Sequence, residues 1–298
     1  MPRFGRVVTA MVTPFNRDQS LNLDGARRLA KWLQDNGNDG LVVAGTTGEA
    51  PVLTDDERLS LFEAVISAVS IPVIAGTGTN DTAHSIHMTK EATALGAAGI
   101  LAVTPYYNRP SQAGIEAHMR AVAGATTLPV VVYDIPVRTG RKISTASLLK
   151  LAREVGNVVA LKDAAGNPAE SALLMSQAPA GFELYSGDDN LTLPFMSIGA
   201  CGVIGVATHW SAEDHQEMFA KWDMGDVVGA RNVNSRLLES FAYETGDENP
   251  NPLPSKVMMN VLGLDVGEAR LPMGPPPAGL EARARQVLDN LRAARAAK

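Results

Sequence analysis

A single lysine at the end of a short apolar run is the first feature of the chain that suggests chemistry. The segment VVALKDAAG carries apolar residues directly into Lys162. Alternation along a strand puts Lys162 on the same face as Val158 and Ala160, which directs its amino group toward an apolar interior. Burial favours the neutral amine, which can attack a ketone to form a Schiff base without a metal or organic cofactor. The alternative is a lysine that reaches solvent or pairs with a neighbouring aspartate.

Hydroxyl and guanidinium groups follow other apolar runs. Tyr133 ends VVVY and could move protons beside an imine, or it could be a core-edge ring with a hydrated hydroxyl. Thr46 and Thr47 follow LVVAG, where they could bind a substrate carboxylate or could only end the strand and cap the next turn. Arg138 in IPVRTG is either a solvated loop charge or a guanidinium group that binds the carboxylate of a second substrate through paired hydrogen bonds.

Metal, disulfide and nucleic-acid chemistry have little support. His84 and His87 lie three apart, but no third ligand with suitable spacing follows them. The one cysteine, Cys201, sits in an apolar run where a buried inert thiol is expected, and its isolation favours a reducing, cytoplasmic compartment. A net charge of -6 argues against nucleic-acid partners and anionic membranes, and no signal peptide or membrane span is expected.

Eight short apolar runs alternate with helical patterns along the chain. An alternation of this kind is typical of a (β/α)₈ barrel, and strands that are apolar throughout fit a parallel sheet covered by helices. A doubly wound open sheet is the alternative, but the chain has no Gly-x-Gly-x-x-Gly turn. The expected strands are Val7–Met11, Leu41–Ala44, Val73–Ala75, Ile100–Val103, Val130–Val132, Val158–Leu161, Phe182–Tyr185 and Val203–Val206.

Helix starts and buried faces can also be predicted. Thr54 followed by Glu57 indicates a capping box, and Ser111 and Ser144 are expected N-caps. Helical spacing predicts a buried face formed by Ala26, Leu29, Ala30 and Leu33, and the helix that begins after Thr54 is expected to carry Leu59, Phe62, Ile66 and Val69.

The strand pattern stops near residue 223. We therefore expect residues 1–223 to form the barrel and residues 224–298 to form a C-terminal helical extension packed on it. In such a barrel the chemistry lies at the carboxyl ends of the strands, so the polar groups named above should meet at one rim.

Five separated motifs resemble the dihydrodipicolinate synthase / N-acetylneuraminate lyase family. They are GTTGE at 45–49, PYYN at 105–108, YDIP with RTG at 133–140, LKDAAG at 161–166 and SGDD at 186–189. TAMVTPF near the start and PNPLPSK near the end also match, so the likeness covers nearly the whole chain in order. The resemblance implies a (β/α)₈ barrel with a helical C-terminal extension and a class I, Schiff-base aldolase acting on pyruvate.

The resemblance also implies roles for individual residues. Lys162 matches the imine-forming lysine and Tyr133 the proton-transferring tyrosine. Thr46 and Tyr107 match the rest of a hydroxyl relay, and Thr47 matches the group that holds the pyruvate carboxylate. In the family the tyrosine at the Tyr107 position crosses a dimer interface, and a dimer of dimers is expected. Two further matches are backbone positions that line the pyruvate pocket, Gly187 and Ile204.

Thr46 together with Arg138 favours the synthase branch, in which the arginine grips the carboxylate of L-aspartate 4-semialdehyde. The implied product is 4-hydroxy-tetrahydrodipicolinate, an early intermediate of lysine and diaminopimelate synthesis. A lyase for N-acetylneuraminate or a 2-keto-3-deoxy sugar acid is the second choice. A catalytically silent barrel that senses a keto acid is the third.

The effector pocket of lysine-inhibited relatives is altered in this chain. The positions that resemble it hold Ala50, Asp55, Arg58 and His84, so that the glutamate that would pair with the amines of lysine is missing. The pattern predicts weak or absent feedback by lysine.

Overall fold

The computed structural model describes residues 2–297, and its centre is a closed barrel of eight parallel strands in sequential order. The predicted (β/α)₈ barrel with a C-terminal helical extension is confirmed, and the open-sheet alternative is wrong. The strands are β1 (Val7–Ala10), β2 (Gly40–Val43), β3 (Val73–Gly76), β4 (Gly99–Val103), β5 (Val130–Asp134), β6 (Val158–Asp163), β7 (Glu183–Ser186) and β8 (Gly202–Gly205).

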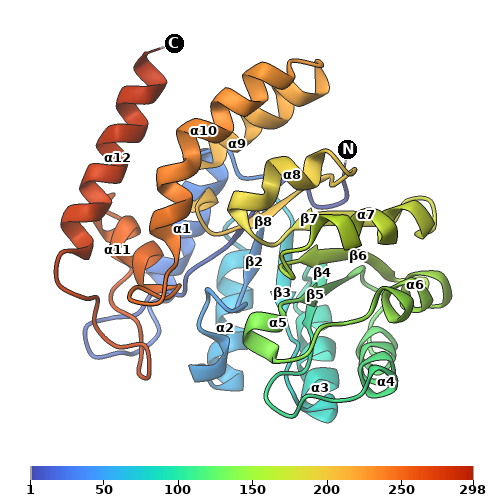
Figure 1. Ribbon diagram of the computed structural model, residues 1–298. Helices are drawn as coiled ribbons and strands as arrows, with labels where there is room; N and C mark the ends of the chain where they lie inside the picture. Colours follow the sequence, from blue (N-terminus) through green and yellow to red (C-terminus); the bar gives the residue numbers. More distant parts are fainter. Residues whose placement is uncertain (1, 298) are drawn as a thin grey trace.

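Helices follow the strands and cover the barrel on the outside (Figure 1). They are α1 (Leu23–Asp35), η1 (Ala50–Val52), α2 (Asp55–Ile66), α3 (Thr82–Ala94), α4 (Gln112–Ala123), α5 (Pro136–Thr139), α6 (Thr145–Glu154), α7 (Pro168–Gln177), η2 (Asp189–Leu191), α8 (Thr192–Met196) and α9 (Thr208–Asp223). Three further helices follow α9, namely α10 (Val227–Glu244), α11 (Leu253–Val261) and α12 (Leu280–Ala296).

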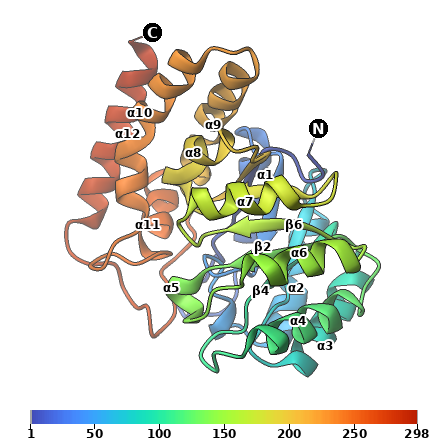
Figure 2. The same cartoon turned by 45° about the vertical axis from the view of Figure 1, so that its right-hand side comes forward.

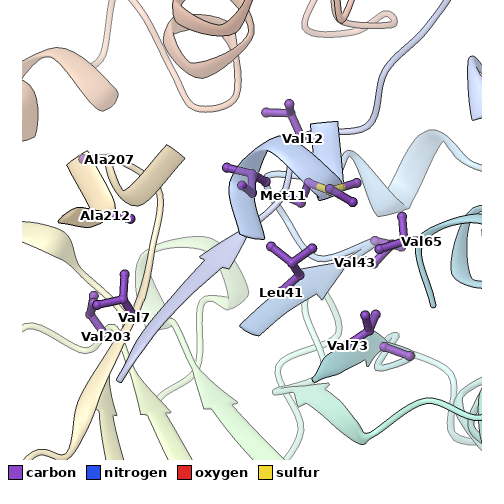
Figure 3. Packing of buried hydrophobic residues seen from close by; sticks show 14 of the residues in the cluster. Val7, Met11, Val12, Leu41, Val43, Val65, Val73, Val203, Ala207 and Ala212 are labelled. Carbon is purple, nitrogen blue, oxygen red and sulfur yellow. The ribbon is translucent and has the colours of Figure 1, made fainter. Parts of the chain in front are cut away.

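The barrel is a packed core because alternate residues of its strands point inward. These residues form a separate apolar cluster that includes Val8, Val42, Ile74, Leu101, Val131, Tyr133, Ala160, Tyr185 and Ile204. The opposite faces of the strands pack against the helices. Figure 3 shows this outer layer, with Val43 of β2 beside Val65 of α2 and with Val7 beside Val203 on adjacent strands.

The local signals for helices are largely confirmed. The predicted face is fully buried on α1, Thr54 and Glu57 form the capping box of α2, and Ser111 and Ser144 cap α4 and α6. The helix expected after Thr54 is present as α2, but it ends at Ile66, so Val69 lies beyond it. Its buried side includes Leu61, Phe62, Ala64 and Val65, whereas Leu59 and Ile66 are only partly buried. This buried side lets α2 contact both β2 and β3.

The prediction that Val158, Ala160 and Lys162 share one face of β6 is partly wrong. Ala160 joins the interior cluster, but Val158 belongs to the outer one. The pairing of β5 with β6 shifts between Val130 and Val131, so that strict alternation is broken before Ala160. Strands β5 and β6 also extend beyond their predicted ends at Val132 and Leu161, so that Tyr133 pairs with Lys162 within the sheet.

The helices after α9 gather on one side of the barrel (Figures 1 and 2). Helix α10 packs along α9, and α12 packs against α10 and α11. Among residues 2–297, no helix combines the length and the apolar character needed to cross a membrane.

Candidate active site

Lys162 is the centre of a buried polar site inside the carboxyl end of the barrel. Only 4% of its surface is exposed, and its Nζ lies 4.3 Å from the centroid of the Tyr133 ring. Burial lowers the pKa of Lys162 to about 8, while the nearby Asp188 and Asp189 oppose that shift. At pH 7 about one amine in ten is then neutral, roughly 300 times the fraction of an ordinary lysine.

Tyr133 is buried beside this amine. Burial raises the pKa of its phenol above the usual value, although a hydrogen bond with the Thr46 side chain opposes the shift. The phenol therefore stays protonated at neutral pH. A protonated hydroxyl next to an amine can donate a proton and recover it, as imine formation requires.

The loop after β2 carries Thr46 and Thr47 to the same place. Ala44, which opens the turn, has a φ of +51°, and Gly48 passes so close to Ala44 and Met11 that a Cβ there would lie 3.1 Å from their backbone atoms. Thr47 is buried, and its Oγ1 accepts a hydrogen bond of 2.9 Å from the Asn251 side chain. The tight turn keeps both hydroxyls at the barrel mouth.

Most of the residues predicted for the site line one cavity of about 470 Å³. Its lining includes Thr46, Thr47, Tyr133, Arg138, Lys162 and Gly187. A second cavity of about 340 Å³ shares Thr46, Tyr133 and Arg138 with the first and is also lined by Tyr106 and Tyr107. Lys162 lines the first cavity only, and the second cavity adjoins the first at the shared residues.

Ile204 and Tyr107 are the predicted residues that do not line the first cavity, although Tyr107 lines the second. Ile204 is fully buried in the barrel interior on β8, just before Val206, which does line the cavity. Tyr107 is 89% exposed and has a φ of +71°, so most of its ring projects from the chain. Gly187, which does line the first cavity, is held in place by its backbone N–H, which donates to the Asp163 carbonyl over 2.6 Å.

Three acidic residues lie close to the amine. Burial raises the pKa of Asp188 to about 6, and burial together with the neighbouring Asp189 raises the pKa of Glu244 well above its usual value. A hydrogen bond with the Asp189 side chain also favours the protonated form of Glu244. The two carboxyls accept the backbone N–H groups of Ala207 at 2.8 Å and Val206 at 2.7 Å. Asp188 and Asp189 place negative charge where an iminium would form.

Asn251 and Glu244 are site residues that the sequence reasoning missed. Glu244 ends α10, and Asn251 precedes α11, so both come from the C-terminal extension. The only available signal was PNPLPSK, which includes Asn251 and was used for the resemblance alone.

Metal ligands and a reactive thiol were not expected, and the candidate side chains have other contacts. His84 pairs with Asp55 over 2.8 Å. The Cys201 thiol donates to the Leu184 carbonyl, and burial raises its pKa to about 12. Within residues 2–297, no three His, Cys, Asp or Glu side chains are grouped closely enough to hold a metal.

Comparisons with known proteins agree on one family. A model of the dihydrodipicolinate synthetase family matches residues 3–290. The 4-hydroxy-tetrahydrodipicolinate synthase of Moorella thermoacetica is 50% identical over 275 residues, which cover 91% of this chain and 92% of the relative. The crystal structure of the enzyme from Cyanidioschyzon merolae with lysine bound is 41% identical, with a TM-score of 0.95, covering 98% of this chain and 99% of the other. A chloride-inhibited dihydrodipicolinate synthase from Acinetobacter baumannii, complexed with pyruvate, is 32% identical, with a TM-score of 0.91 over 97% of this chain and 99% of that one.

Proposed function

This chain belongs to the dihydrodipicolinate synthetase family, and from that premise we propose how its own residues carry out the family's reaction. The activity is the condensation of pyruvate with L-aspartate 4-semialdehyde, which gives 4-hydroxy-tetrahydrodipicolinate for lysine and diaminopimelate synthesis. Several relatives that carry this name are 42–50% identical, which supports the synthase over the neuraminate or sugar-acid lyase.

The observation that best supports the assignment of residues is the buried Lys162 amine, with a pKa of about 8, beside Tyr133. The neutral Nζ attacks the keto carbon of pyruvate. Tyr133 protonates the carbinolamine oxygen, which leaves as water when the imine forms, and Thr46 passes protons to and from the phenol. Thr47 and the turn after β2 hold the pyruvate carboxylate, and the backbones of Gly187 and Ile204 border the bound pyruvate.

The second half of the reaction forms one bond and releases the lysine. Loss of a proton from the methyl carbon of the bound pyruvate gives an enamine, which attacks the aldehyde carbon of the semialdehyde. The α-amino group of the second substrate then displaces the Lys162 nitrogen and closes the ring. Arg138 binds the carboxylate of this substrate, since it lies at the exposed side of both cavities.

Assembly and organisation complete the proposal. The exposed Tyr107 ring completes the hydroxyl relay in the cavity of a second copy, which makes the chain a homodimer, and two dimers form a tetramer. Residues 1–223 act as the barrel, and residues 224–298 as an extension packed on it. The single cysteine and the metabolite substrates are consistent with a cytoplasmic location.

The assignment can be tested with substrates and matched variants. We expect turnover of pyruvate with aspartate semialdehyde, and little product with N-acetylmannosamine or simple aldehydes. Lys162→Ala should abolish turnover. Arg138→Ala should raise the KM for the semialdehyde but not for pyruvate, whereas Arg141→Ala, on the same loop, should change neither. Preferred turnover of N-acetylmannosamine, or normal activity of Lys162→Ala, would refute the proposal.

A further inference from the structure

A second buried lysine lies outside the roles assigned above. Lys256 on α11 is only 2% exposed, and its Nζ forms an ion pair of 2.6 Å with Glu49 Oε1. It also donates to the Glu268 carbonyl over 2.9 Å and lies 4.2 Å from the centroid of the Phe15 ring. Burial lowers the pKa of Lys256 to about 8, although Glu49 opposes that shift. The extension thus brings a buried charge against the barrel, next to the turn that follows β2.

Glu49 ends the turn that carries Thr46 and Thr47. Its φ is +55°, a conformation that non-glycine residues keep only when their surroundings hold them in it. Its backbone N–H donates to the Thr46 carbonyl over 3.0 Å. Its second carboxylate oxygen accepts a hydrogen bond of 2.9 Å from the Arg270 backbone. Both oxygens of Glu49 are therefore engaged by the extension, while its backbone is bonded to the turn.

A second contact from the extension reaches the same turn. The Asn251 side chain donates to Thr47 Oγ1 over 2.9 Å, and both residues are buried. Because the Thr47 oxygen accepts this hydrogen bond, its hydroxyl proton is left to be donated elsewhere. Thr47 also lines the cavity that holds Lys162, so its hydroxyl can donate this proton to a substrate bound there.

We propose that Lys256 is a positioning residue for pyruvate binding: through its ion pair with Glu49 it holds the turn in the conformation that presents Thr46 and Thr47 to the substrate carboxylate. This inference rests on the function proposed above for the two threonines. It assigns the C-terminal extension a part in substrate binding, in addition to covering the barrel.

The chemistry of the pair favours positioning over stability. Two charges taken out of water lose their hydration, and apolar residues of similar volume often stabilise a protein equally well or better in their place. A buried pair does, however, fix the relative position of its two partners. Thr46 and Thr47 need such a fixed position, because both must contact one small substrate carboxylate.

The double variant Lys256→Met with Glu49→Gln is the sharpest test because it leaves no unpaired buried charge. We expect a melting temperature equal to or above that of the wild type, together with a pyruvate KM raised about tenfold. The KM for aspartate semialdehyde should change less than twofold. Each single variant should also raise the pyruvate KM, and the double variant should raise it no more than the more affected single variant.

Arg295→Met is the matched control. It breaks another contact of the extension with the barrel, to Asp214 of α9, away from the turn. It should lower the melting temperature and leave the pyruvate KM unchanged.

The outcomes separate this inference from the function on which it rests. A double variant with the wild-type pyruvate KM overturns the positioning role, provided that Thr47→Val raises that KM. If Thr47→Val also leaves the pyruvate KM unchanged, the proposed role of the turn fails, and the inference fails with it. If the double variant binds pyruvate normally but melts earlier, the pair is only structural.

Discussion

Lys162→Met should make the protein more stable while abolishing its activity. The pKa of Lys162 is about 8 in the folded chain, against 10.5 for an ordinary lysine. Because the folded value is the lower one, the unfolded chain binds more protons, and stability falls as the pH drops from 10.5 toward 8. At pH 7 the full difference applies and costs about 3 kcal/mol. Methionine fills a similar volume and carries no charge, so the variant avoids this cost.

The pH dependence makes this prediction specific. At pH 9.5 the unfolded chain is still mostly protonated while the folded lysine is mostly neutral, and the expected advantage of the variant falls to about 1 kcal/mol. Thermal unfolding without pyruvate should show Lys162→Met melting roughly 5–10 °C higher than the wild type at pH 7 and clearly less at pH 9.5. Lys90→Met, which removes an exposed lysine from α3, serves as the control and should shift the melting temperature little at either pH. Equal or lower stability of Lys162→Met at pH 7, or a gain independent of pH, would refute the claim that Lys162 is held in a costly, water-poor site.

Three further outcomes are expected. Glu244→Gln should leave the pH midpoint of imine formation near 8, because burial and Asp189 favour the uncharged form of Glu244 and the amide is uncharged as well; a midpoint more than one unit lower in the pH–rate profile would show that Glu244 carries charge beside Lys162. Gly205→Ala should lower stability by about 1–3 kcal/mol in denaturant titrations, since its Cβ would lie 2.4 Å from Asp189 Oδ1, and wild-type stability would contradict this close packing. Lysine at sub-millimolar concentration should not inhibit, because the buried Arg58 places positive charge where the amines of the effector would bind, and a saturable inhibition curve would overturn that expectation.

Much of the fold could be predicted from local sequence patterns, because these features depend only on residues that are close together in the chain. The capping box at Thr54 and Glu57, and the inward direction of Lys162, needed only a few residues of context. The position of Val158 on the outer face could not be predicted from β6 alone, because it depends on a shift in pairing with β5. The buried side of α2 likewise depends on tertiary packing, since the two strands beneath the helix decide which of its residues are covered.

The site was predicted from the barrel strands and was therefore incomplete. Lys162, Tyr133 and Thr46 follow apolar runs, so their position at the barrel mouth could be predicted from the strand pattern. Asn251 and Glu244 reach the cavity only because the extension folds back on the barrel across a long stretch of chain. Their positions depend on tertiary packing, and no local spacing marks them as site residues.

The most direct measurement is reductive trapping of pyruvate as a function of pH. Borohydride added to the enzyme with pyruvate should leave a reduced adduct, and peptide mass spectrometry should place it on Lys162. The initial trapping rate should rise about tenfold per pH unit below 8 and level off above it, following the neutral amine. An adduct on another lysine, no adduct, or a rate that keeps rising toward pH 10 would contradict a buried, readily deprotonated Lys162.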